Sequence, residues 1–153
     1  MATTVGTEST LDDLLSDLIQ LDYDAAAAYQ AAIDRLDNAH FRDALSRFKQ
    51  DHLRHTEDLG QILSSMGKTP PTEGDAKSLL TKGKVVLAGL VGDKAILQAM
   101  KTNEDDTNTA YERALKHREA NSKVHGALDR ALDDERHHRD WIVETIEKQN
   151  RDF

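Results

Sequence analysis

The chain has 153 residues, and its 20 basic against 28 acidic side chains give a formal net charge of −8 at pH 7. A chain of this length is one domain that can bury a real core, and its negative charge argues against a nucleic-acid binder or a protein held on an anionic membrane surface. Cysteine is absent, which excludes disulfides, iron–sulfur clusters, Cys-ligated zinc and c-type haem attachment.

The first ten residues are polar and lack the apolar stretch of a signal peptide. No run approaches the ~18 apolar residues of a membrane span. The cytoplasm is therefore the expected location.

Two long helices are expected in the first part of the chain, each marked by apolar residues that alternate in steps of three and four. The first extends over about 10–37 and begins at Thr10, which is placed to cap it. After a short turn, the second extends over about 39–66, with Gly67 placed to end it.

The next segment, residues 67–92, is expected to be a long crossover. Pro70 and Pro71 prevent its first part from continuing the second helix. The apolar stretch at about 76–90 predicts a short helix inside the crossover.

Two further long helices follow, over about 93–118 and 121–149, and Asp93 is expected to cap the first of them. Helices that are joined by short turns are antiparallel neighbours. The sequence therefore predicts one all-α domain over residues 1–153, a four-helix bundle of two antiparallel hairpins joined by the long crossover.

Six ionisable side chains stand at core positions midway along these helices, where apolar residues are expected. They are Asp22, His52, His55, Glu104, Glu135 and His138. An ionised carboxylate in a dry core is costly unless it is paired or binds a metal. Counting from the turns places all of these residues at one level, so they are expected to lie side by side.

Their pattern repeats between the two hairpins. Each hairpin carries a carboxylate, a tyrosine seven residues later and, on its second helix, two ligand-type residues three positions apart. In the first hairpin these are Asp22, Tyr29, His52 and His55, and in the second they are Glu104, Tyr111, Glu135 and His138. This order indicates a two-fold pseudo-repeat.

With this pattern, residues 10–149 resemble the ferritin-like superfamily, and among its members the small rubrerythrin-type bundles, some of which have no assigned function. In that family one Glu from each of two helices and a Glu-x-x-His from each of the other two bind two iron or manganese ions. The resemblance implies terminal carboxylates at Asp22 and Glu104, a complete pair at Glu135 and His138, and an altered pair at His52 and His55.

Two of these positions depart from the family pattern. Asp22 is one methylene shorter than Glu, and His52 replaces a bridging carboxylate, which leaves Glu135 as the only bridge. A neutral imidazole is expected to serve one metal only. The two metal positions should then differ, with the weaker one near Asp22, His52 and His55, or a single ion should bind.

Several residues keep alternative interpretations. Tyr29 and Tyr111 are core aromatics whose hydroxyls need a partner, and they could hydrogen-bond metal-bound carboxylates. His52 and His55 could be core histidines that are satisfied by carboxylates without metal.

Other ionisable groups are expected to lie on solvated faces. Glu135 and His138 could themselves be a coincidental surface pair. Asp51 could substitute as a ligand, but we expect a solvated face for it and for the Asp133–Asp134 pair.

The expected cofactors are at most two divalent ions per chain, iron first and manganese or zinc next, with no haem or nucleotide. If the ions cycle between redox states, the resemblance implies oxidation of Fe(II) or reduction of peroxide or O₂, a chemistry of oxidative stress. The chain lacks the cysteines of a rubredoxin module, so an external electron donor is expected.

The other expected partner is a second copy of the chain, most simply in a homodimer. The alternative is a non-catalytic, structural or stress-associated interaction bundle whose site is degenerate or filled by zinc. A subunit of a ferritin cage would need a fifth C-terminal helix, for which there is no signal.

Overall fold

The computed structural model describes residues 3–73, 87 and 89–151. Within these residues the chain is all-α, with four long helices and no strand, as predicted. The helices are α1 (Leu11–Arg35), α2 (Ala39–Ser65), α4 (Asp93–Ala114) and α5 (Ser122–Arg151). None of the helices in the described part of the chain is long and apolar enough to cross a membrane.

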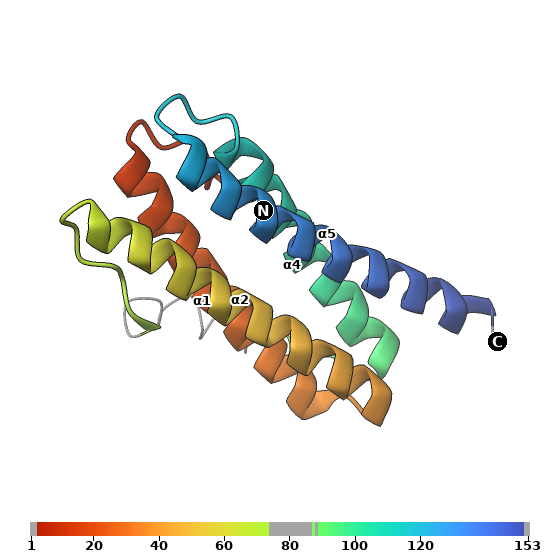
Figure 1. Cartoon of the computed structure of the whole chain (residues 1–153). Helices are drawn as coiled ribbons and strands as arrows, with labels where there is room; N and C mark the ends of the chain where they lie inside the picture. Colours follow the sequence, from red (N-terminus) through yellow and green to blue (C-terminus); the bar gives the residue numbers. More distant parts are fainter. Residues whose placement is uncertain (1–2, 74–86, 88, 152–153) are drawn as a thin grey trace.

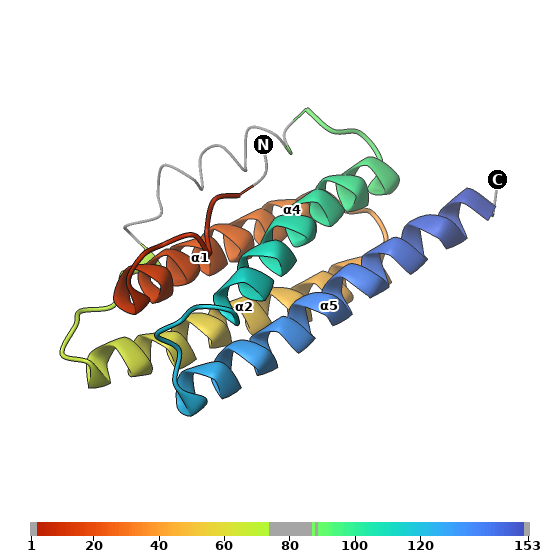
Figure 2. The same cartoon turned by 90° about the horizontal axis from the view of Figure 1, so that it is seen from above.

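The helices form two hairpins that face each other. α1 packs against α2 and α4 against α5, while α1 lies beside α4 and α2 beside α5 (Figures 1 and 2). The carboxylate of Asp93, at the start of α4, accepts hydrogen bonds from the backbone N–H groups of Asp37 and Asn38 at 2.8 and 3.0 Å. α4 therefore starts beside the α1–α2 turn, at the end of the bundle opposite to the end of α2.

The short helix expected at 76–90 lies largely outside the described residues. The caps around this segment are visible. Gly67 follows α2 with a positive φ of 77°, and the N–H groups of Gly67 and Lys68 donate to the carbonyls of Ser64 and Leu63, both at 3.0 Å. This pair of bonds satisfies the last carbonyls of the helix and ends α2 where the sequence predicts.

Two expectations about α4 are wrong. Asp93 does not cap the helix: Gly92 is the N-cap, no side chain bonds there, and the Asp93 carboxylate is occupied by the α1–α2 turn. The helix also ends at Ala114 rather than near residue 118. Past this end His117 lies 3.0 Å from the Glu8 carbonyl, so a contact with the N-terminal segment replaces the expected last turn.

The core consists of two apolar clusters separated by a polar layer. One cluster contains Leu15, Leu63 and Leu128, and the other, towards the opposite end of the bundle, contains Leu45 and Leu97. The ionisable side chains named above lie between these clusters. The fold therefore holds charged groups where water cannot solvate them.

Candidate metal centre

The structure brings all six ligand-type residues together from the four helices. Their exposed fractions are 0%, except for 3% at His55. They fall into two sets whose potential ligand atoms lie within 4.8 Å of one another, and both sets contain His52 and Glu135. The members are Asp22, His52, His55 and Glu135 in one set, and His52, Glu104, Glu135 and His138 in the other.

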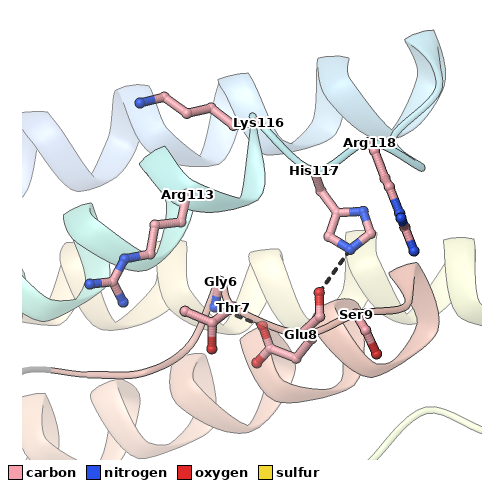
Figure 3. A pocket seen from close by; sticks show the side chains of 8 residues that line it. All are labelled: Gly6, Thr7, Glu8, Ser9, Arg113, Lys116, His117 and Arg118. Carbon is pink, nitrogen blue, oxygen red and sulfur yellow. Dashed lines mark hydrogen bonds between the residues drawn. The ribbon is translucent and has the colours of Figure 1, made fainter.

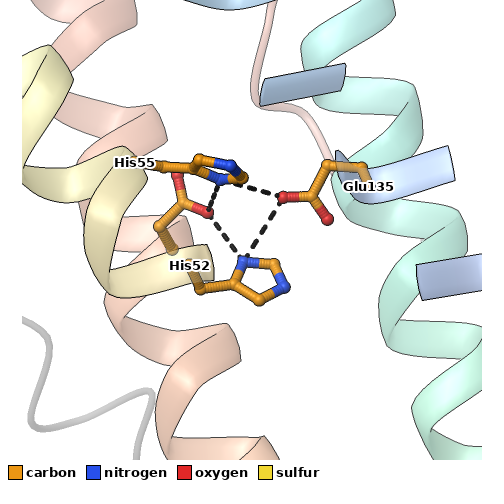
Figure 4. Close-up of side chains that lie close together, drawn as sticks. His52, His55 and Glu135 are labelled. Carbon is orange, nitrogen blue, oxygen red and sulfur yellow. Dashed lines mark hydrogen bonds and ion pairs between the residues drawn. The ribbon is translucent and has the colours of Figure 1, made fainter. Parts of the chain in front are cut away.

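In the first set four atoms form a closed ring (Figure 4). Asp22 Oδ1 lies 2.8 Å from His52 Nδ1 and 3.3 Å from His55 Nδ1. Glu135 Oε1 lies 3.4 Å from His52 Nδ1 and 3.3 Å from His55 Nδ1. A divalent ion bound by four tetrahedral ligands at 2.0–2.2 Å separates them by about 3.3–3.6 Å, so three of the four sides of the ring already have this length.

The second set is more open. Glu104 Oε1 lies 3.1 Å from His52 Nε2 and 3.4 Å from His138 Nδ1, which is itself 3.7 Å from Glu135 Oε2. The sequence groups His52 with Asp22 and His55 alone, whereas the structure places it in both sets. Its Nδ1 faces Asp22 and Glu135 and its Nε2 faces Glu104, so the ring lies between Asp22 and Glu104.

Two atoms of the cluster lack a hydrogen bond. Among the described residues, Glu135 Oε1 and His138 Nδ1 are buried without a hydrogen-bond partner. Leaving such atoms unsatisfied costs stability. One unsatisfied atom belongs to each set, and both are ligand atoms that a metal ion accepts.

Tyr29 and Tyr111 do bond to carboxylates of the cluster, each across to the opposite hairpin. The Tyr29 hydroxyl donates to Glu104 Oε1 and the Tyr111 hydroxyl donates to Asp22 Oδ2. Thr107, which lies three residues after Glu104 on α4, donates to Glu135 Oε2 at 2.9 Å or to Glu104 Oε2 at 3.0 Å. These hydroxyls fix the orientation of the acidic side chains.

The expectation that Asp51 and Asp134 lie on solvated faces is wrong. His55 Nε2 lies 2.9 Å from Asp134 Oδ2, and His138 Nε2 lies 2.8 Å from Asp51 Oδ2. Both aspartates are only partly exposed. A carboxylate on the outer nitrogen of an imidazole orients the ring and raises the basicity of its inner nitrogen, so both histidines present Nδ1 to the cluster.

The carboxylates favour the charged form of each histidine. Burial alone would lower the pKa of His52, but the charge of Glu135 and a hydrogen bond to Asp22 outweigh burial and raise the pKa to about 9. Burial is likewise outweighed at His55, where bonds to Asp134 and Asp22 raise the pKa to about 12.

His138 follows the same balance. Burial lowers its pKa, but bonds to Asp51 and Glu104 raise it to about 11. Without metal, all three imidazoles are therefore cationic at neutral pH and compensate the charge of the carboxylates.

Among the three core carboxylates, Glu135 differs from the other two. Burial would raise the pKa of Asp22 and Glu104, yet hydrogen bonds from the histidines outweigh it and hold both pKa values below their usual range. At Glu135, burial is opposed by the charge of His52 but still raises the pKa. Glu135 is thus the carboxylate whose charge the protein compensates least.

A large surface pocket lies elsewhere, between the N-terminal segment and the end of α4 (Figure 3). It has a volume of about 670 Å³, and its basic side chains come from the last turn of α4 and the residues that follow. Arg113 donates to the Thr3 and Val5 carbonyls, and His117 contacts the Glu8 carbonyl. These contacts fix the N-terminal segment, and the pocket contains none of the clustered ligand-type residues.

Comparison with known proteins gives one family. Residues 11–117 match the model of a family described as Domain of unknown function (DUF2383). The match spans α1, α2 and α4 and stops before α5, which carries Glu135 and His138. No curated protein and no solved structure matches the chain significantly.

Proposed function

The chain belongs to the DUF2383 family, and we propose that it is a ferritin-like metalloprotein that binds up to two divalent ions between its hairpins. Residues matching a ferritin-like ligand pattern come from all four helices. One set offers Asp22, His52, His55 and Glu135, and the other offers His52, Glu104, Glu135 and His138.

The unsatisfied atoms carry this proposal. Glu135 Oε1 and His138 Nδ1 are fully buried ligand atoms that make no hydrogen bond among the described residues, only ion-pair contacts at 3.3–3.7 Å. If the cluster had only a structural role, a side chain that gave these atoms hydrogen-bond partners would make the protein more stable. A metal ion in each set would satisfy both.

Iron is the ion that we propose first, because the ligand pattern resembles that of ferritin-like proteins. The mixture of imidazole and carboxylate donors suits manganese or zinc as well. When bound, a pair of irons would supply oxidation of Fe(II) or reduction of peroxide or O₂. The sequence contains no cysteine, so electrons for such a reaction would come from an external donor. A cytoplasmic homodimer remains part of the proposal.

One observation favours the alternative, a non-catalytic bundle. The three imidazoles pair with carboxylates at 2.8–3.4 Å, which compensates charge in the absence of metal. A bundle with such a self-paired core would need no ion to fold. Metal binding therefore has to be measured directly.

We would dialyse chelator-treated protein against anaerobic Fe(II), Mn(II) or Zn(II) and measure metal by elemental analysis. We expect between one and two ions per chain. His138→Ala should lose bound metal, whereas His137→Ala, a change at the exposed neighbour on α5, should not. No bound metal in the parent, or equal metal in both variants, would contradict the proposal.

A further inference from the structure

The cover over the cluster differs between its two sides. Towards α1 and α4, the carboxylates are covered by Tyr29, Tyr111 and Thr107, all with an exposed fraction of 0%. Towards α2 and α5, His55 and His138 are covered by Asp134 and Asp51, whose side chains are 32% and 24% exposed. On this side the carboxylate that bonds the outer nitrogen of each histidine is itself partly exposed to water.

One guanidinium joins these two carboxylates. Arg54 Nη1 lies 3.0 Å from Asp51 Oδ1, and Arg54 Nη2 lies 2.5 Å from Asp134 Oδ2. The interaction links α2 to α5 across this partly exposed side of the cluster. Arg54 itself is 50% exposed, so its side chain can leave without disturbing the core.

We propose that Asp51 and Asp134 form a port through which divalent cations reach the cluster, and that Arg54 closes this port by holding both carboxylates. The inference rests on the proposed function. Two carboxylates that bind a guanidinium between them offer the oxygen ligands that a hydrated divalent cation accepts. Each carboxylate also contacts a histidine of the cluster, so a cation at the port is one side chain away from the inner ligands.

The port is open only when Arg54 releases at least one aspartate. An exposed ion pair shifts such an equilibrium by up to about fivefold. Removing Arg54 should therefore raise the rate of metal association by roughly two- to fivefold, because the open state is then always populated. The number of ions bound should stay the same, because Arg54 is not in either ligand set.

The test is stopped-flow absorption with Co(II) added to the metal-free full chain, at physiological ionic strength to screen long-range charge. Arg136→Ala is the matched control. It also removes one positive charge, but from α5, and the ion pair that it breaks, Arg136 with Glu112, is exposed and long, at 4.0 Å. We expect faster association in Arg54→Ala, and the parent rate in Arg136→Ala.

Arg54→Lys separates closure from simple repulsion. Lysine keeps the positive charge but lacks the planar fork that holds two carboxylates, so it should also bind Co(II) faster than the parent. Three results would contradict the port but not the proposed function: Co(II) association at the parent's rate in Arg54→Ala, equally fast association in Arg136→Ala, or association at the parent's rate in Arg54→Lys. Absence of Co(II) binding in every protein would contradict the proposed function as well.

Discussion

Glu135 occupies the centre of the cluster in both geometry and charge. Its Oε1 faces His52 and His55 in the first set, and its Oε2 lies 3.7 Å from His138 in the second. Its pKa is raised by burial, unlike those of Asp22 and Glu104. A single carboxylate thus serves both sets and has the most to gain from a cation.

We therefore expect Glu135→Ala to reduce metal binding more than Asp22→Ala. Glu135 belongs to both sets, whereas Asp22 belongs to one, so the Asp22 variant keeps the set that contains Glu104 and His138. Titration calorimetry with Zn(II) measures the affinity and the number of ions for each variant. Equal losses, or a greater loss in Asp22→Ala, would show that the role of Glu135 is misassigned.

The sequence pattern was sufficient to predict which ionisable side chains lie in the core, but not which carboxylates at the edge of the core contact them. Asp22 and Glu104 stand at buried positions of their helices, which made them conspicuous. Asp51 and Asp134 lie at the edge of the buried face, where a carboxylate is ordinary. The repeat contains a feature that could have indicated their role: each aspartate immediately precedes the first residue of a ligand-type pair, His52 or Glu135.

At the scale of the helices, α2 and α5 deliver the same constellation to the same place. On each helix an aspartate is followed directly by one ligand-type residue and, three positions later, by a histidine. Each aspartate contacts the histidine of the opposite helix, Asp134 with His55 and Asp51 with His138. Each helix therefore orients the histidine of the other.

This exchange predicts that Asp134→Asn weakens metal binding. Replacing a carboxylate on the outer nitrogen of a ligating histidine typically costs about 10–100-fold in metal affinity, and the loss should fall on the set that contains His55. Asp133→Asn is the matched control, because Asp133 is the exposed neighbour on the same helix. Calorimetric titration with Zn(II) should show unchanged affinity for Asp133→Asn. Equal affinities in both variants would show that Asp134 does not support metal binding through His55.

The apolar periodicity of the sequence was sufficient to predict that the four helices form, but not where α4 ends. Gly67 ends α2 through its own conformational freedom, which is readable from the residue itself. The end of α4 coincides with a contact between His117 and the Glu8 carbonyl, more than 100 residues apart in sequence. A contact of that range is set by the tertiary fold, and no nearby glycine or proline marks the position.

For the whole molecule, the cluster makes stability depend on pH, and we expect it to make stability depend on metal as well. The folded-state pKa values of His52, His138 and His55 are raised to about 9, 11 and 12. An unfolded histidine titrates near pH 6.5, so the stability from these raised pKa values is complete below about pH 6.5 and decreases as pH rises towards 9 and beyond. Metal-free protein should therefore lose stability between pH 6.5 and 9.

Acid acts in the opposite direction through the carboxylates. The pKa values of Asp22, Glu104, Asp51 and Asp134 are lowered in the folded state, so their contribution is present above about pH 4 and is lost on further acidification. The raised pKa of Glu135 opposes this trend, and so do Asp17 and Asp24, whose pKa values burial raises to about 6. The cluster itself should therefore stabilise the metal-free protein most between about pH 4 and 6.5.

A bound metal ion should reverse this trend at neutral and alkaline pH, because histidine must lose its proton to bind an ion. The most direct test is the thermal unfolding midpoint of the chelator-treated protein from pH 6 to 8, with and without Zn(II). Because a ligand that binds only the folded state stabilises it, the midpoint should rise with Zn(II), and the increment should grow with pH. A midpoint that Zn(II) leaves unchanged at every pH, in protein shown to be metal-free at the start, would contradict the proposed metal centre.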